Sequence, residues 1–188
     1  MYKTIKFHVQ GVAPLLMHNC RLANPREPFT RAMKAITGKG KNKTDADNEE
    51  LSRLEFFGGL YANEKGAPCI PGERIEGMIC EAARKTKKGK DAKAGIISDG
   101  LWELIYDGPK DAEKLWADGR FVDVRGPGVN KARIMRTRPR FDAWKLKFEV
   151  SYNPEVVNER ELKEWVAKAG EIVGLCDYRP RYGRFVFV

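Results

Sequence analysis

The sequence predicts an α+β domain whose core is ferredoxin-like, or RRM-like, with the element order β-α-β-β-α-β. Three observations lead to this prediction: residues alternate as in strands near both ends of the chain, amphipathic helices have clear boundaries, and the elements follow one another in this order. The 188 residues fit a single domain, residues 1–188. We therefore expect an antiparallel sheet with helices on one face and the other face open to a ligand.

The first strand is predicted at residues 2–9, where every second residue from Ile5 is apolar. Residues 10–44 contain three prolines and the run GKGKNK, a composition that favours loops. Within this segment we expect only a short helix, at residues 29–36.

Two longer helices follow in the sequence. The first is capped by Thr44 or Asp45 and ends at residues 58–59, a pair of glycines. The second runs from Gly72 to about Lys85, with its apolar residues on one face, and leads into a basic loop. These helices are expected to cover the sheet.

The second half of the chain is predicted to consist mainly of strands. They are expected at residues 101–106, 121–125, 131–137 and 141–152. The second and third form the arms of a hairpin around residues 126–128, which include two glycines and a proline. We regard residues 107–140 as an inserted, protruding basic hairpin.

A final helix and strand complete the predicted core. Asn158 caps the helix, Glu161 is placed as in a capping box, and Gly170 is expected to end the helix. Residues 184–188, RFVFV, form the last predicted strand.

The composition indicates a polyanionic partner. Lys and Arg number 35 against 26 acidic residues, which gives a net charge of +9 and a pI near 9.4. Such an excess attracts nucleic acid over long range. Four cysteines without a C-x-x-C spacing, and only two histidines, give no zinc pattern, so we expect no metal and no cofactor. The chain has no apolar run of membrane-spanning length and no signal-peptide pattern at its start, so we expect a cytoplasmic protein that does not enter a membrane.

The densest basic region lies between Arg120 and Lys147, where only two acidic residues occur. Residues two apart share a face of a strand, so Arg136, Arg138 and Arg140 are predicted to line up, and guanidinium groups bind phosphate well. The predicted phosphate-binding residues of this region are Arg125, Lys131, Arg133, Arg136, Arg138 and Arg140. The alternative is a solvated edge hairpin whose charges prevent edge pairing.

Two further regions could contact a strand. The segment after the last helix combines glycine, arginine and tyrosine, which suits close approach to phosphates and stacking on bases. Its candidates are Arg179, Arg181, Tyr182 and Arg184; alternatively, it is an ordinary turn in which Asp177 pairs with an arginine. Lys87 and Lys88, in the basic loop after the second long helix, are weaker candidates.

The sequence carries no P-loop, nucleophile elbow or dinucleotide fingerprint, and we expect no enzyme. One alternative stays open: His18, in the loop sequence PLLMHN, could act as the general base of a metal-independent endoribonuclease. The simpler interpretation is a hydrogen-bonded loop histidine.

Two segments carry a family resemblance. The segment IPGERIEG at residues 70–77 resembles the IPGSSLKG start of the first helix in the RAMP superfamily of CRISPR proteins, and GLCDYRPRYGRF at residues 174–185 resembles the glycine-rich loop of that superfamily. The resemblance extends to backbone subunits of CRISPR effector complexes, which polymerise along a guide RNA in antiviral defence. It implies that Arg74 faces an RNA groove and that residues 120–140 form a thumb-like hairpin. The phrases PLLMHN and DYRPRYGRF also resemble those of phage and prophage proteins.

The sequence therefore predicts a non-catalytic protein that binds single-stranded RNA or DNA and assembles side by side along the strand. The alternatives are a phage single-stranded DNA-binding protein, an endoribonuclease that uses His18, and an interaction protein whose basic face meets an acidic protein.

Overall fold

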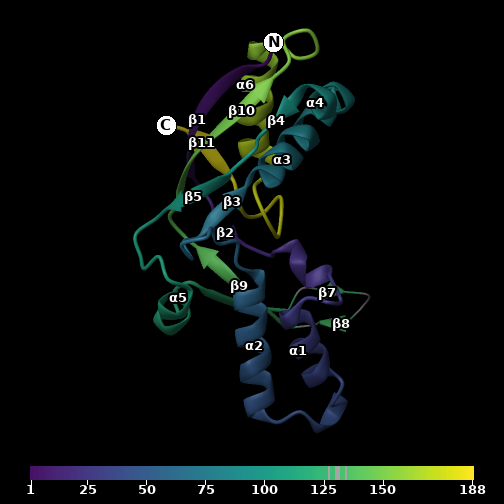
Figure 1. Ribbon diagram of the computed structural model, residues 1–188, viewed down its shortest axis with the longest axis vertical. Helices are drawn as coiled ribbons and strands as arrows, with labels where there is room; N and C mark the ends of the chain where they lie inside the picture. Colours follow the sequence, from purple (N-terminus) through teal and green to yellow (C-terminus); the bar gives the residue numbers. More distant parts are fainter. Residues whose placement is uncertain (127, 130–131, 134) are drawn as a thin grey trace.

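The computed structural model describes residues 1–126, 128–129, 132–133 and 135–188, of which residues 128–129 and 132–133 are described by their backbone alone. The molecule is elongated, with an antiparallel sheet and its helices at one end and a helical hairpin at the other (Figure 1). The expected α+β class is confirmed.

The main sheet is antiparallel throughout and has the strand order β11-β1-β10-β5-β3. Its strands are β1 (Lys3–Gly11), β3 (Cys69–Pro71), β4 (Ile96–Ile97), β5 (Leu101–Ile105), β10 (Lys145–Tyr152) and β11 (Phe185–Phe187). The short strand β4 pairs with the far end of β10 along the same edge as β5, so β4 and β5 act as one interrupted strand. The strands predicted at 2–9, 101–106 and 184–188 are confirmed.

Two helices cover one face of this sheet, α3 (Gly72–Arg84) and α6 (Glu159–Lys168) (Figure 1). Helix α3 buries Ile75, Met78 and Ile79 completely, as the apolar pattern predicts. Asn158 caps α6 by accepting a hydrogen bond from the backbone N–H of Glu161, at 2.8 Å. The short helix α4 (Gly89–Gly95), which packs beside α3 at this end of the sheet, begins within the predicted basic loop.

The expected end of the last helix at Gly170 is wrong, because α6 continues into a π-helical turn at Ala169–Val173. A Cβ atom on Gly170 would lie 2.3 Å from the carbonyl oxygen of Phe185. The glycine therefore permits a close approach of β11 rather than ending the helix.

The other face of the sheet is polar along its two central strands. His8 pairs with Lys147, Gln10 with Lys145, and Lys6 forms an ion pair with Glu149 at 3.2 Å. The only outward ring on β1 and β10 is the imidazole of His8, and neither strand carries an outward Phe, Tyr or Trp.

A second, smaller sheet lies below the first and has the order β2-β9-β6, formed by β2 (Leu15–Leu16), β9 (Arg136–Phe141) and β6 (Val122–Arg125). The helical hairpin α1 (Pro28–Thr37) and α2 (Asp45–Gly59) extends from it (Figure 1). Helix α5 (Ala112–Asp118), which the sequence analysis missed, lies beside it and is capped by the Asp111 side chain. Thr44 and Asp47 form a capping box at the start of α2.

The predicted hairpin differs in its pairing. The strand β6 pairs with β9, with Arg125 opposite Arg136, whereas residues 132–133 form the short strand β8, which pairs with β7 (Gly128–Val129). The continuous strand expected at 141–152 is also wrong, because β9 ends at Phe141 and a turn precedes β10. The segment at residues 107–140 therefore does not protrude as a whole, because its strand β9 is the central strand of the small sheet.

Candidate nucleic-acid interface

The arginines of β9 share one face of the strand, as the alternation predicts, but they are engaged in ion pairs. Arg136 Nη1 lies 2.6 Å from Glu55 Oε1, and Arg138 Nε lies 2.6 Å from Asp177 Oδ2. Arg138 is 8% exposed. The expectation that this row has few acidic partners is therefore wrong.

Arg125 and Arg140 share a third carboxylate, the buried Asp123. Burial alone would raise the pKa of Asp123, but the hydrogen bonds and charges of the two guanidinium groups outweigh burial and lower this pKa. Arg125 also donates to the hydroxyl of Tyr182 at 2.8 Å, and its guanidinium lies over the rings of Tyr178 and Tyr182. These contacts fasten the small sheet to the C-terminal segment.

Two of the phosphate contacts predicted in the hairpin have no described side chain. Lys131 lies outside the described residues, and the side chain of Arg133 is not described either. Of the predicted row, every arginine whose side chain is described has a carboxylate partner within 4.0 Å.

The C-terminal loop at residues 174–184 has a defined conformation. Gly174 and Gly183 have φ of +83° and +72°, values that favour glycine, and a Cβ on Gly183 would lie 2.0 Å from the carbonyl oxygen of Leu175. The backbone N–H of Asp177 donates to the carbonyl of Leu16 at 2.9 Å, and that of Gly183 to the carbonyl of Pro14 at 2.8 Å. The loop is thereby held against the β2 segment.

The predicted contacts of this loop divide into two groups. Asp177 pairs with an arginine, as the alternative interpretation of the segment had it, and Arg179 pairs with Glu81 at 3.0 Å. Arg181 is exposed, whereas Arg184 Nε donates to the carbonyl of Pro180 at 2.7 Å. Neither Arg181 nor Arg184 has a carboxylate within 4.0 Å in the part of the chain that the structure describes.

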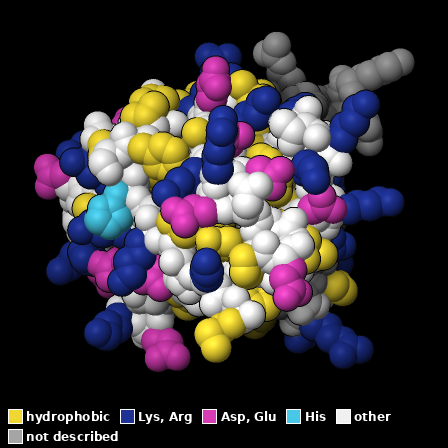
Figure 2. All heavy atoms as spheres, turned by 90° about the horizontal axis from the view of Figure 1, so that it is seen from above, with side chains coloured by type: hydrophobic (Ala, Val, Ile, Leu, Met, Phe, Trp, Pro, Cys, Tyr) yellow, Lys and Arg dark blue, Asp and Glu magenta, His cyan; other side chains and the backbone are white. Residues whose placement is uncertain are grey.

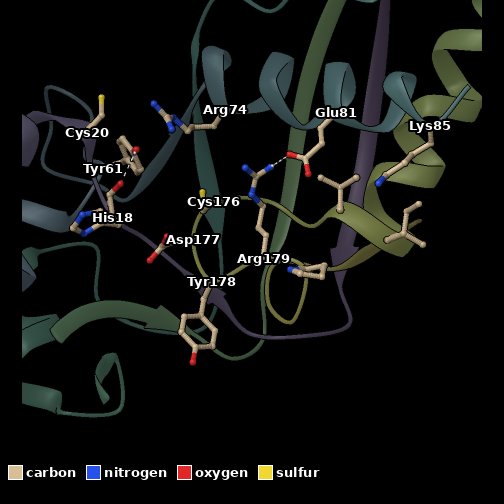
Figure 3. Close-up of a pocket in the computed structure, with 13 residues that line it drawn as sticks. His18, Cys20, Tyr61, Arg74, Glu81, Lys85, Cys176, Asp177, Tyr178 and Arg179 are labelled. Atoms are coloured by element: carbon tan, nitrogen blue, oxygen red, sulfur yellow. Dashed lines mark hydrogen bonds and ion pairs between the residues drawn. The ribbon is translucent and has the colours of Figure 1, made fainter. Parts of the chain in front are cut away.

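A cleft of about 750 Å³ lies between α3 and the C-terminal loop (Figure 3). Arg74, Glu81 and Lys85 line it from one side because positions seven and eleven residues apart share a face of a helix. Cys176–Pro180 line it from the other side, and His18 with Tyr61 lie at one end. We call this space the α3 cleft.

The α3 cleft contains cations without acidic partners. Within the described residues, Arg74 and Lys85 have no carboxylate within 4.0 Å, and the Nε atom of Arg74 is buried without a hydrogen-bond acceptor. The Arg74 guanidinium lies 5.9 Å from the centre of the Tyr61 ring. Of the predicted loop contacts, Lys87 is exposed and Lys88 pairs with Asp91 at 3.0 Å.

Burial controls the titration of the groups that line the cleft. It raises the pKa of the Cys176 thiol and that of the Tyr61 hydroxyl to about 12 each, so both stay protonated at neutral pH. The pKa of His18 is lowered, chiefly by burial, although Asp177 opposes the shift. The Tyr61 hydroxyl donates to the backbone carbonyl of His18 at 3.0 Å.

Sequence reasoning identified Arg74 in this site only through the resemblance, and it did not place Tyr61 or Lys85 beside Arg74. Helical spacing could have put Lys85 on the face of Arg74, but the facing loop lies about a hundred residues further along the chain. Charge is not gathered at the sheet end of the molecule: viewed from above, basic, acidic and apolar side chains are interspersed (Figure 2).

Among the described side chains, no group of three or more His, Cys, Asp or Glu is placed to hold a metal ion. No helix in the described ranges has the length and apolarity needed to cross a membrane. Compared with known proteins, the chain matches no family model and no curated protein.

Proposed function

We propose that the protein binds single-stranded nucleic acid and that the strand lies in the α3 cleft. The observation that carries this proposal is a pair of cations on one face of α3, Arg74 and Lys85, which have no carboxylate partner among the described residues and face the loop that presents Arg179. Guanidinium and ammonium groups bind phosphates.

The dimensions suit a short stretch of strand. Arg74 and Lys85 are eleven residues apart, which corresponds to about 16 Å along a helix. At a rise of about 3.4 Å per nucleotide, this length covers about five stacked nucleotides. A cleft of this kind takes a single strand more readily than a duplex, whose bases are paired and inaccessible.

The strand order supports a ferredoxin-like core for this proposal. The order β11-β1-β10-β5 places the last core strand beside the first, and the third between the first and the second, with α3 and α6 as the two crossing helices. RNA-binding domains of this topology commonly stack bases on the open sheet face. The central strands here carry no outward Phe, Tyr or Trp, only the imidazole of His8, and this favours the cleft over the sheet.

The resemblance to RAMP backbone subunits leads us to propose assembly of several copies along one strand, either a guide RNA in antiviral defence or a phage single-stranded DNA. Phosphate contacts and stacking serve both nucleic acids. Parallel measurements on RNA and DNA of the same sequence distinguish these partners.

One observation supports a second candidate, a metal-independent endoribonuclease. His18 lines the α3 cleft, and its lowered pKa keeps the imidazole neutral at neutral pH, as a general base requires. Structured RNA incubated with the protein in EDTA tests this candidate. Cleavage that disappears in His18→Ala supports the nuclease, and intact RNA with the unmodified protein rules it out.

The binding proposal is tested by fluorescence anisotropy with a labelled 12-nucleotide strand. Lys85→Gln is expected to weaken binding about threefold to tenfold, because one phosphate contact is lost. Lys114→Gln is the matched control, since Lys114 is an exposed lysine on α5, away from the cleft. With about three phosphate contacts, log affinity should fall against log salt with a slope near −2. Equal affinities for the two variants would reject the cleft as the site.

A further inference from the structure

The α3 cleft has two different ends (Figure 3). Lys85 lies at one end and is exposed, two residues before the exposed Lys87 in the sequence. At the other end, which we call the inner end, Arg74 lies near Tyr61 and Cys20. The ends therefore differ in how much protein surrounds a bound strand.

Hydrogen bonds join two chain segments at the inner end, where His18 and Cys20 are exposed. Tyr61, which is 5% exposed, donates its hydroxyl hydrogen bond to the carbonyl of His18 at 3.0 Å. The backbone N–H of Asn19 donates to the carbonyl of Gly59, also at 3.0 Å. These bonds join the segment after β2 to the end of α2, so that protein lies beyond Arg74 along the direction of α3.

Arg74 is placed to receive an anion at this end of the cleft. Its Nε atom is buried without an acceptor, and within the described ranges no carboxylate lies within 4.0 Å of its guanidinium. A guanidinium without a carboxylate partner attracts an oxyanion, which its Nη atoms would contact. The ring of Tyr61 at 5.9 Å adds a cation–π contact that holds the guanidinium in place.

We infer that the inner end of the α3 cleft receives a terminal phosphate of the bound strand, a phosphomonoester, with Arg74 as its principal contact. This inference rests on the proposed function. An internal phosphodiester needs room for the strand on both sides, whereas a terminal group needs it on one side only. A phosphomonoester also carries about one more negative charge than a diester and has three unesterified oxygens that accept hydrogen bonds. Inorganic phosphate shares this chemistry.

The test compares four forms of one eight-nucleotide strand: with a 5′-phosphate, with a 3′-phosphate, with both, and with neither. Affinities are measured by anisotropy with an internal label, for RNA and for DNA. One end phosphate is expected to strengthen binding about tenfold, in line with a charge-assisted hydrogen bond. Arg74→Gln should remove this preference, whereas Lys114→Gln should keep it. Circular dichroism melting shows that both variants are folded.

The outcomes separate this inference from the proposed function. Tighter binding of one phosphorylated form, lost in Arg74→Gln and reduced by millimolar inorganic phosphate, supports a terminal-phosphate site. If all four forms bind the unmodified protein equally, the inference is overturned while strand binding stands. If no form binds, strand binding itself fails, and the inference fails with it. The comparison of the four strands needs no variant, so a misfolded Arg74→Gln protein would not prevent the decision.

Discussion

The carboxylate of Glu55, on α2, accepts hydrogen bonds from Arg136 Nη1 at 2.6 Å and from the backbone N–H of Thr137 at 2.7 Å. Glu55 is 6% exposed and Thr137 is 3% exposed, so this contact joins the helical hairpin to the small sheet in a buried environment. Arg136 is thus a structural residue as well as a basic one.

We predict that Glu55→Ala lowers the free energy of unfolding by about 3 kcal/mol, because it leaves a buried N–H without an acceptor and a guanidinium without its partner. Urea denaturation measures the loss. Glu49→Ala, at an exposed position of the same helix, should change stability by less than about 0.5 kcal/mol. Similar losses in both variants would contradict a structural role of Glu55.

Asp123 should make stability depend on pH in the acid range. Its pKa is lowered in the folded protein, because the hydrogen bonds from Arg125 and Arg140 outweigh burial. The folded state therefore binds a proton less readily than the unfolded state, so the stability that Asp123 contributes is present above its ordinary pKa of 3.8 and is lost as pH falls through the folded value.

We expect thermal unfolding midpoints of the unmodified protein to fall between about pH 5 and pH 3, and those of Asp123→Asn to start lower and to fall less. Asp99→Asn, which changes an exposed carboxyl, should keep the original pH dependence. Parallel curves for Asp123→Asn and the unmodified protein would show that this carboxylate is not responsible.

His18 gives a second pH effect of the same sign at higher pH. Its pKa is lowered from the ordinary 6.5, chiefly by burial; the charges of Arg138 and Arg136 act in the same direction, and those of Asp177 and Glu55 oppose them. As pH falls below 6.5, the unfolded chain takes up the proton first, so stability decreases down to the folded pKa. The unfolding midpoint should therefore decline from pH 7 to pH 5, and His18→Gln should remove this decline. His8→Gln, which changes the other histidine of the chain, on β1, should keep it.

The elements that the sequence predicted well carry local signals. The capping box at Thr44 and the cap at Asn158 lie within four residues of the helices they begin, and the alternation in β1 and β10 repeats over a whole strand. Helix α5 had such a signal too, since Asp111 caps it and Gly119 with φ +74° ends it, but its seven residues are too few for a clear period.

The partners of the basic residues could not be predicted from local patterns. Glu55 lies 81 residues before Arg136, and Asp177 lies 39 residues after Arg138, so only the folded chain brings each pair together. Acidic residues were counted only near the arginines in the sequence. This count therefore underestimated how many carboxylates pair with the arginines of β9. The α3 cleft depends in the same way on a contact between distant segments, α3 and the C-terminal loop.

Two glycines should respond in opposite ways to substitution by alanine. Gly77 is exposed within α3, and a Cβ there would have no neighbour within 4 Å, so Gly77→Ala should raise stability by about 0.5 to 1 kcal/mol through helix propensity.

Gly174 has φ +83°, and its Cβ would lie 2.3 Å from the carbonyl oxygen of Tyr182. Gly174→Ala should lower stability by about 2 kcal/mol or more and weaken strand binding. Denaturation and anisotropy measure both effects; a Gly174→Ala protein of unchanged stability would show that the loop tolerates another conformation.

The charge of the cleft can also be increased, which gives a prediction in the direction opposite to loss of function. Glu81 lies on the cleft face of α3 and pairs with Arg179 at 3.0 Å, with both side chains partly exposed. Glu81→Gln removes a negative charge beside the proposed strand and releases Arg179 for a phosphate, while an exposed ion pair of this kind contributes only about 0 to 1 kcal/mol to stability. Single-strand affinity should therefore rise about twofold to fivefold at low salt, and the gain should shrink at higher salt as charges are screened.

Glu73→Gln, on the same helix but outside the cleft, is the matched control and should change affinity less. Equal gains in the two variants would indicate a general effect of net charge and would argue against a strand in the α3 cleft.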